Sequence, residues 1–398
     1  MMIIVYFTYL ILLGIVALNV LYWLVFSIAG RLGRADDTNA DPATSVYRKI
    51  GVLIPAYKED AVIVESVTQN LRQTYPADRY ELIVIADSFQ PQTLAKLAAL
   101  PIHVLEVSFE VSTVAKAINS ALSRLPLEQY DILVVSDADN HMAPDFLSRI
   151  NQAFAQGWRA VQGHRVAKNI NTSVAILDAI SEEINNHIFR KASRVLGLSS
   201  ATIGSGMAFE PGLMKAAMAT QHTMGGYDKE LETNIVLSGH KIGYLEDAFI
   251  YDEKVANRAV FENQRTRWIA AQWQFITVYF SRGIAEIIHG RFASGFKVLQ
   301  AVFLPKILLL GVLFGCIVAG FLSGNPSLWE APLILLLTLC GSLIISVPTH
   351  LWKRITFREL LLVPLLLLSF VRAVLNMRKA FKRFMHTPHT STTGTPVS

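Results

Sequence analysis

Charged residues are scarce in this chain, and cysteines are nearly absent. Only 17% of the 398 residues are charged, whereas about a quarter are charged in an ordinary soluble protein. The two cysteines, Cys316 and Cys340, both lie in apolar stretches, which excludes a disulfide framework and a cysteine-based metal site. The composition therefore indicates a membrane protein with a water-soluble centre.

Long stretches without any charged residue lie at 3–28, 307–329 and 332–348. The first two are long enough to cross ~30 Å of hydrocarbon at ~1.5 Å per residue, and the third is nearly so. No basic residue precedes the first stretch, which is about twice as long as the apolar region of a signal peptide, roughly 7–15 residues. We therefore expect a retained N-terminal anchor rather than a cleaved leader.

Basic residues indicate how the chain is oriented. Several follow the first apolar stretch: Arg31, Arg34, Arg48 and Lys49. The positive-inside rule places this side of the anchor in the cytosol. Others form a run in the tail: Arg378, Lys379, Lys382 and Arg383. Such a run is typical of contact with lipid headgroups, and no basic patch interleaved with aromatic residues indicates nucleic-acid binding, so we expect membrane lipids as partners and no nucleic acid.

The centre of the chain alternates between apolar runs and helical patterns. Runs typical of buried strands lie at 50–54, 81–85, 102–105 and 131–135, with helical periodicity at 62–71 and 115–125. This alternation predicts an α/β fold with a mostly parallel sheet and right-handed crossovers. Ligands bind beyond the carboxyl ends of such strands, and three of these ends carry carboxylates: Pro55–Glu59, Asp87 and Asp137–Asp139.

The segment Ser136–Asp139 directly follows the fourth predicted strand. Asp137 and Asp139 are two residues apart, so both can reach one hard cation, and their oxygens suit Mg²⁺ or Mn²⁺. Such a cation would neutralise a leaving diphosphate. Asp87, at another strand end, could accept hydrogen bonds from a nucleobase or a ribose.

A carboxylate near this site could act as a general base toward an acceptor hydroxyl. Asp228, Glu230 and Glu232 all lie in one short stretch. Chemistry alone leaves the choice among them open, and capping of a helix N-terminus is the alternative for each.

The segment 258–280 mixes aromatic and basic residues, which is typical of a helix in the membrane interface; an amphipathic core helix is the alternative. Gln264 and Arg267 are three residues apart and share a helical face. Arg267 could bind a diphosphate through two parallel hydrogen bonds. Trp268 offers a flat face to a sugar ring, or an anchor among lipid headgroups.

Taken together, these motifs resemble the processive-type family 2 glycosyltransferases, which include cellulose, hyaluronan and chitin synthases. The resemblance covers roughly Lys49 to Trp273. It rests on Val52–Glu59, Ile85–Asp87, Ser136–Asp139, Gly204–Phe209, Asp228 and the Gln-x-x-Arg-Trp signature at Gln264–Trp268. The tail segment Phe384–Pro388 is also similar to a short terminal motif of some bacterial members.

The resemblance implies a cytosolic GT-A domain, with a Rossmann-like sheet, flanked by transmembrane helices. It also implies an inverting single displacement from a UDP-sugar. The implied donor contacts are Ala56, Tyr57, Glu59, Asp87, Lys116, Asp137, Gln264, Arg267 and Trp268. The implied metal ligands are Asp137 and Asp139, and the implied base is Asp228. The implied acceptor site is formed by Gly204, Ser205, Gly206 and Met207.

Three segments depart from the family pattern. Tyr227 precedes Asp228 where the family has Thr-Glu, and Ser88–Pro91 replaces a Gly-Ser-x-Asp segment. Ser112–Ala115 replaces a Gly-Lys stretch, which leaves Lys116 as the basic residue. These departures bear on which sugar and which acceptor are used more than on the class of reaction.

The sequence thus predicts an integral membrane enzyme of the bacterial inner membrane, with a cytosolic catalytic domain, that extends a polysaccharide or other glycan. Single-sugar transfer to a lipid, as in ceramide glucosyltransferases, is the alternative among enzymes. A catalytically inactive membrane scaffold is the alternative outside them.

The expected organisation has five parts: an anchor at 1–30, a linker at 31–48, the catalytic domain at 49–256, interfacial helices at 257–303, and a membrane-associated region with a basic tail at 304–398. Within the last part, 360–376 is apolar but contains Pro364 and Arg372. If this stretch spanned the membrane, the basic tail would lie outside, against the positive-inside rule. We therefore expect an interfacial or re-entrant helix there.

Overall fold

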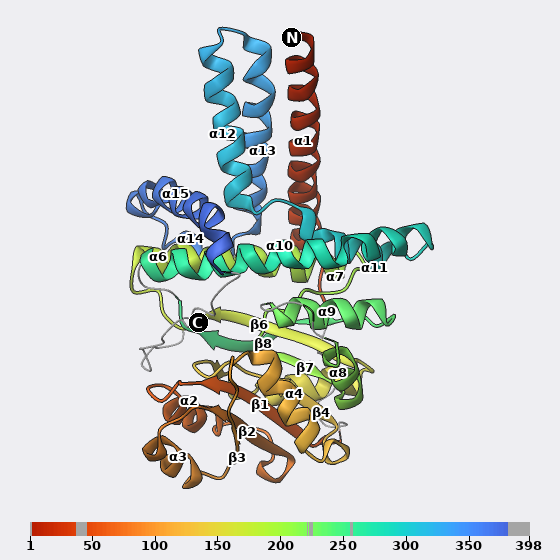
Figure 1. The fold of residues 1–398 in the computed structure, drawn as a ribbon, viewed down its shortest axis with the longest axis vertical. Helices are drawn as coiled ribbons and strands as arrows, with labels where there is room; N and C mark the ends of the chain where they lie inside the picture. The colour runs from red at the N-terminus through yellow and green to blue at the C-terminus, as the bar shows by residue number, and fades with distance from the viewer. Residues whose placement is uncertain (1, 37–45, 221, 223–225, 255–257, 381–398) are drawn as a thin grey trace.

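The computed structural model describes residues 2–36, 46–220, 222, 226–254 and 258–380. Figure 1 shows three levels: a sheet with its covering helices, a layer of helices lying across it, and a group of upright helices. Linker residues 37–45 and the tail from 381 onward, including Phe384–Pro388, lie outside the described residues.

Eight strands form one sheet in the order β3-β2-β1-β4-β7-β6-β8-β5. They are β1 (Ile50–Tyr57), β2 (Tyr80–Asp87), β3 (His103–Val107), β4 (Ile132–Val135), β5 (His141–Met142), β6 (Ala160–Ala167), β7 (Met207–Phe209) and β8 (Gly243–Asp252). The first four strands are parallel, β6 is parallel to β8, and β7 and β5 are antiparallel to their neighbours. The predicted α/β fold with a mostly parallel sheet is confirmed.

Helices cover both faces of this sheet: α2 (Ile63–Asn70), α3 (Pro91–Ala98), α4 (Val114–Arg124), α5 (Phe146–Ala155), α8 (Pro211–Met218) and α9 (Tyr227–Leu237). Ile50, Val52 and Ile54 of β1 pack with α2, α3 and α5, whereas Leu53 packs with α4, α8 and α9. Consecutive strand residues point to opposite faces, so burial on both faces explains the continuous apolar runs in the sequence.

A layer of helices lies across the sheet domain (Figure 1). It contains α6 (Ser173–Asn185), a π-helical segment that continues it (Asn186–Ala192), α7 (Ser193–Val195), α10 (Arg258–Ile288), α11 (Phe292–Leu299), α14 (Thr349–Trp352) and α15 (Phe357–Ala380). α15 packs along α10 and also contacts α6. The stretch at 360–376 therefore lies against these helices, and its depth in a membrane stays a prediction.

Three apolar helices stand side by side on this layer: α1 (Met2–Leu32), α12 (Lys306–Leu322) and α13 (Glu330–Ser346). Trp23 of α1, Leu309 of α12 and Leu339 of α13 share a buried cluster with Ile188 of the π-helical segment. Within the described chain, α1 alone is long and apolar enough to cross a membrane by itself. The helical pair of 292–302 and 306–322 passes the same test only as one span bent by 60°, and α13 is shorter.

Candidate active site at the strand ends

The ends of β1 and β2 place two predicted donor contacts next to each other. Tyr57 and Asp87 are partners in the parallel register, and the backbone nitrogen of Lys58 donates to the Asp87 carbonyl at 3.1 Å. Lys58 and Ser88 have φ angles of 54° and 60°. This left-handed conformation costs a non-glycine residue about 1–3 kcal/mol and is concentrated at functional sites. Its occurrence at two adjacent strand ends supports a ligand site at this edge.

The other predicted donor contacts near this edge differ in exposure. Asp87 is 1% exposed, and the Ser88 hydroxyl donates to its Oδ1 at 2.8 Å. Glu59 is also buried, and the Ala56 side chain is part of the core, so only the backbone of Ala56 could reach a nucleotide. Lys116, in the first turn of α4, is exposed, and its ammonium donates to a carbonyl of the preceding loop at 2.7 Å.

The predicted metal ligands lie in a turn directly after β4. Asp139 is 3% exposed, whereas Asp137 is partly exposed. The backbone nitrogen of Asp137 donates to Ser205 Oγ at 3.0 Å. The Asn140 amide oxygen accepts from Ser205 Oγ at 2.7 Å, and its nitrogen donates to Oδ1 of Asp139 and of Asp252, each at 3.2 Å. The turn thus joins the predicted metal ligands to the predicted acceptor loop.

The donor set of this turn suits a hard cation, because carboxylate oxygens are the ligands that Mg²⁺ and Mn²⁺ prefer. Among the residues that the structure describes, no three histidine, cysteine, aspartate or glutamate side chains converge into a complete metal site. Asp137 and Asp139 would therefore supply part of the coordination. Diphosphate oxygens and water would supply the remainder, as is common for Mg²⁺.

Asp252, the last residue of β8, is a further strand-end carboxylate that the sequence analysis missed. Lys254 Nζ lies 2.6 Å from its Oδ2, and Arg165 Nε lies 3.9 Å from the same oxygen. Burial raises the pKa of Asp252; Arg165 lowers it, and the charges of Asp139 and Asp137 raise it further. The rule that found the other acids, a carboxylate after a buried strand, would have found Asp252 had β8 been recognised.

Asp228 is the second residue of α9 and lies beside the predicted acceptor loop. A β-carbon placed on Gly204 would be 3.8 Å from Asp228 Oδ2 and 3.8 Å from the Tyr227 hydroxyl. That hydroxyl donates to the Gly204 carbonyl at 2.8 Å. Burial raises the pKa of Asp228, and the charge of Glu232 raises it further. A carboxylate with a raised pKa beside a glycine is suited to accept a proton from a substrate hydroxyl.

The two alternative bases have partners deep in the fold. Glu230 is 0% exposed, and its Oε1 accepts from the Tyr279 hydroxyl of α10 at 2.7 Å. Glu232 is 1% exposed, and its Oε1 lies 3.3 Å from Lys297 Nζ of α11. These contacts hold α9 against the helix layer. Glu232 Oε2 also accepts from the Thr202 backbone nitrogen at 2.9 Å, two residues before the loop, whereas Asp228 borders Gly204 itself.

The predicted acceptor loop has a backbone that requires glycine. Gly204 and Gly206 have φ angles of 82° and 69°, and a β-carbon on Gly206 would lie 2.7 Å from Ile250 Cγ2. Met207 begins β7, and its side chain is buried in the core. Only the backbone of Met207 could therefore face an acceptor, whereas Gly204 borders Asp228 directly.

The Gln-x-x-Arg-Trp signature lies near the N-terminal end of α10. Arg265, inside the signature, forms a buried ion pair with Asp178 of α6. Its guanidinium also lies 4.1 Å from the centre of the Trp268 ring, within the range of a cation–π contact. The signature is thus fixed to α6 through a residue that the sequence analysis assigned no role.

One face of α10 turns toward the start of α9. Gln264, Arg267 and Ala271 follow at helical spacing and share that face. A β-carbon placed on Gly226, just before α9, would lie 3.4 Å from Ala271 Cβ and 3.9 Å from Asp228 Oδ1. The Oε1 atom of Gln264 is buried and has no hydrogen-bond partner among the described residues. The signature face therefore borders the region of the predicted base.

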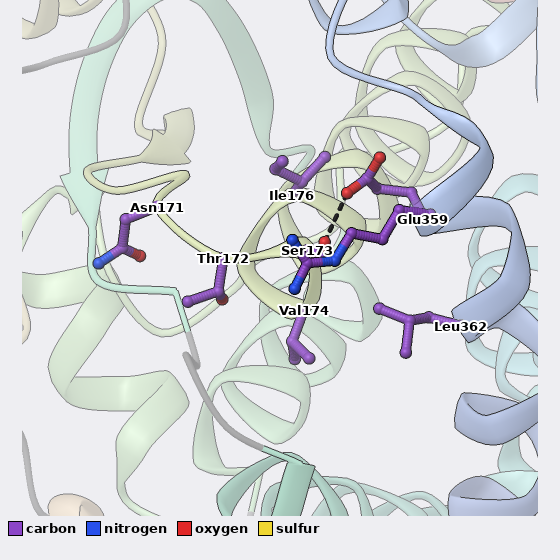
Figure 2. A pocket seen from close by; sticks show the side chains of 8 residues that line it. Asn171, Thr172, Ser173, Val174, Ile176, Glu359 and Leu362 are labelled. Atoms are coloured by element: carbon purple, nitrogen blue, oxygen red, sulfur yellow. Dashed lines mark hydrogen bonds between the residues drawn. The ribbon is translucent and has the colours of Figure 1, made fainter.

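A separate cavity of about 400 Å³ lies where α6 and α15 begin (Figure 2). Its lining includes Ser173, Arg358, Glu359 and Leu362, and the Ser173 hydroxyl donates to Glu359 Oε1 at 2.5 Å. No residue predicted for the donor, metal, base or acceptor lines this cavity. It joins two helices of the layer and is not part of the strand-end site.

Residues 48–271 match the family model described as glycosyltransferase like family 2. A β-monoglucosyldiacylglycerol synthase of Synechocystis sp. is 25% identical over 269 residues, which cover 63% of this chain and 56% of the relative. A probable glucomannan 4-β-mannosyltransferase of Oryza sativa subsp. japonica is 26% identical over 241 residues, which cover 56% and 42%. The chain thus spans about half the length of the curated relatives it matches.

Among solved structures, the chain is similar to a mannosyltransferase from Pyrobaculum calidifontis, determined in complex with GDP-Man and Mn²⁺. The TM-score is 0.53 at 17% identity, covering 86% of this chain and 98% of the other. This likeness shows the GT-A fold, as predicted.

Proposed function

Since the chain belongs to the glycosyltransferase-like family 2, we propose that it transfers a sugar from a nucleotide sugar to a hydroxyl group of a membrane lipid. The position of α9 carries the proposal for the acceptor. Figure 1 shows α9 between the sheet and the layer that bears the apolar helices. Asp228 would therefore meet an acceptor on the membrane-facing side of the sheet. Relatives named β-monoglucosyldiacylglycerol synthase support a lipid acceptor.

On the donor side, Tyr57, Glu59 and Asp87 would hold the nucleoside of the donor, which is expected to be uridine. Asp137 and Asp139 would hold Mg²⁺ or Mn²⁺, which supplies positive charge to the departing diphosphate. The mannosyltransferase with a similar fold was determined with Mn²⁺, which supports a divalent ion. Lys116 and Arg267 would add positive charge, Arg267 through its forked guanidinium.

The transfer itself would be a single displacement. Asp228 removes the proton of the acceptor hydroxyl while that oxygen bonds to the anomeric carbon, and the bond from this carbon to the diphosphate breaks on the opposite face. The configuration of the sugar is therefore inverted. The raised pKa of Asp228 makes it a stronger base than an ordinary aspartate.

Extension of a glycan is a second candidate. The Gln-x-x-Arg-Trp signature at Gln264–Trp268 favours it, and relatives named probable glucomannan 4-β-mannosyltransferase support it. Product analysis separates the two candidates. Membranes containing the protein are incubated with labelled UDP-sugars and GDP-mannose in Mn²⁺ or Mg²⁺. We expect label in the lipid extract, with one sugar per lipid. Label in a long insoluble polymer would favour glycan extension, and no transfer from any donor would overturn both.

The proposed donor requires a cytosolic site, which the basic residues after α1 also predict. A cysteine introduced at exposed Lys58 should resist an impermeant thiol reagent in intact cells and react after lysis. Labelling in intact cells would contradict both the orientation and the use of a cytosolic nucleotide sugar.

A further inference from the structure

Arg165 of β6 is a buried cation to which the transfer described above gives no part. It is 8% exposed, and its Nε donates to Glu182 Oε1 of α6 at 2.6 Å. Its Nη1 donates to the Ile203 carbonyl at 3.3 Å, and its Nε lies 3.9 Å from Asp252 Oδ2. One guanidinium therefore contacts the helix layer, the strand-end acids and the residue before Gly204.

Two side chains of β6 hold Ile203, the residue before the acceptor loop, through both its backbone nitrogen and its backbone carbonyl. Gln162 Oε1 accepts from the Ile203 backbone nitrogen at 3.1 Å, and Gln162 Nε2 donates to the Ser205 carbonyl at 2.9 Å. Arg165 holds the Ile203 carbonyl. Because Gly204 follows directly and borders Asp228, these bonds set the distance between the loop and the predicted base.

Arg165 also acts on Asp228 through its charge. Burial raises the pKa of Asp228, Glu232 raises it further, and Lys229 and Arg165 lower it. Buried Arg190 of the π-helical segment also lies within electrostatic reach of Asp228. Arg165 is the cation on the sheet side of this group, whereas Lys229 and Glu232 belong to α9 itself.

We propose that Arg165 is a positioning residue for the transfer, which holds the glycine loop beside Asp228. The inference rests on the proposed function, because it concerns the base of that reaction. It makes a demand that a purely structural ion pair with Glu182 does not make: the charge at position 165 must affect the protonation of Asp228.

The test compares Arg165→Gln with Arg165→Lys. Removing the charge raises the pKa of Asp228, so the acidic limb of kcat against pH should move to higher pH in Arg165→Gln. We expect kcat to fall roughly 10- to 100-fold, as misplacement of a reacting group by about 1 Å does, with UDP binding within about threefold of wild type. Arg165→Lys keeps the charge but loses the forked N–H donors of the guanidinium. Its kcat should therefore fall, while the acidic limb of its pH profile should stay where it is in wild type.

Arg159→Gln is the matched control. Arg159 directly precedes β6, at the other end of the same strand, and pairs with Glu210 on the surface. This variant loses an arginine–carboxylate pair, yet its kcat and pH profile should match wild type. If Arg165→Gln fails to fold because buried Glu182 then keeps only Lys254 as a cationic partner, the double variant Arg165→Gln with Glu182→Gln is measured instead.

A second measurement needs no turnover. The carboxyl band of Asp228 is followed by infrared difference spectroscopy during a pH titration, with Asp228→Asn subtracted. The protonated band should appear at higher pH in Arg165→Gln than in wild type. If the band shifts but wild type uses no donor, the proposed function fails, and only the electrostatic effect of Arg165 on Asp228 stands. If wild type transfers sugar but neither the band nor the acidic limb shifts, Arg165 is only structural and the inference is overturned.

Discussion

The two halves of the catalytic sheet differ in what holds their polar residues. In the half built from β1 to β4, acids follow apolar strands, and the strands are held by core residues such as Leu53 and Ile83, both 0% exposed. In the half built from β6 to β8, buried cations and acids join strands to helices: Arg165 to Glu182, and Lys254 to Glu182 and Asp252. Substituting the strand-end acids of the first half should therefore leave its apolar core intact. In the second half the charged side chains themselves hold the strands against the helices.

The largest loss of turnover should come from removing a predicted metal ligand in the first half. Asp139→Ala should abolish turnover, because the diphosphate would lose the charge that the cation supplies, and EDTA should do the same to wild type. Since neighbouring strands are held by apolar packing, the melting temperature of Asp139→Ala should stay within a few degrees of wild type. Activity and thermal unfolding in detergent measure both. Full activity in EDTA would contradict the metal assignment.

Asp228→Asn should have the next largest effect. Loss of a general base typically costs ~10²–10⁴-fold in rate, so turnover should fall by about that factor while UDP binding survives. Glu230→Gln is the matched control on the same helix, and it should lower stability more than turnover because Glu230 accepts from Tyr279. Near-normal turnover in Asp228→Asn together with a large loss in Glu230→Gln would show that Asp228 is not the base.

A buried pair in the helix layer should matter for stability. Asp178→Ala leaves Arg265 buried without its carboxylate, and breaking a buried pair costs about 3–5 kcal/mol. Asp178→Ala with Arg265→Ala should recover part of this loss. Asp145→Ala, which breaks a partly exposed pair with Arg149, should cost only about 0–1 kcal/mol. Equal effects of the two aspartates in denaturation would contradict the expected difference between a buried and a partly exposed ion pair.

The smallest expected effect is the dependence of stability on pH that the His164–Glu183 pair produces. His164 Nε2 lies 3.1 Å from Glu183 Oε1, and its Nδ1 lies 2.9 Å from the Glu246 carbonyl, so both ring nitrogens face acceptors. Burial lowers the pKa of His164, but the charge and hydrogen bonds of Glu183 outweigh it and raise the pKa. Although burial raises the pKa of Glu183, the His164 charge and hydrogen bonds lower it overall.

A raised His164 pKa gives stability below its unfolded value of 6.5 that is lost as the pH rises through the folded value. A lowered Glu183 pKa gives stability above 4.5 that is lost as the pH falls. Glu183→Gln should therefore cost most between these limits, about 1–3 kcal/mol, and less in alkaline solution. Melting temperatures from pH 5 to pH 9 measure this, and a loss independent of pH would rule out the ionised pair.

The first half of the sheet could be predicted from the sequence, and the second could not. Runs such as Ile50–Ile54 are buried on both faces, and the acids at Asp87 and Asp137 follow them directly. By contrast, β7 has only three residues, and β6 contains the polar residues Gln162, His164 and Arg165, so neither has the expected apolar run.

The partners of the buried charges could not be predicted either, because sequence patterns report neighbours along one element. Arg265 pairs with Asp178 from a distant helix, and Lys254 pairs with Glu182. The choice among Asp228, Glu230 and Glu232 needed the same long-range information. Glu230 and Glu232 contact the helix layer, whereas Asp228 borders Gly204.

The length of α10 has a mechanical consequence. Its 31 residues make a rod of about 46 Å at ~1.5 Å per residue. Near its middle, Gln272 Nε2 donates to the Ala301 carbonyl at 2.8 Å, a few residues before α12 begins. A stiff rod moves as one piece, so this bond couples the start of α12 to the whole of α10, from Trp268 to exposed Ile288. Helices that span a membrane tilt to match bilayer thickness, so in the predicted membrane location a change of thickness at α12 would reach α10 through this bond.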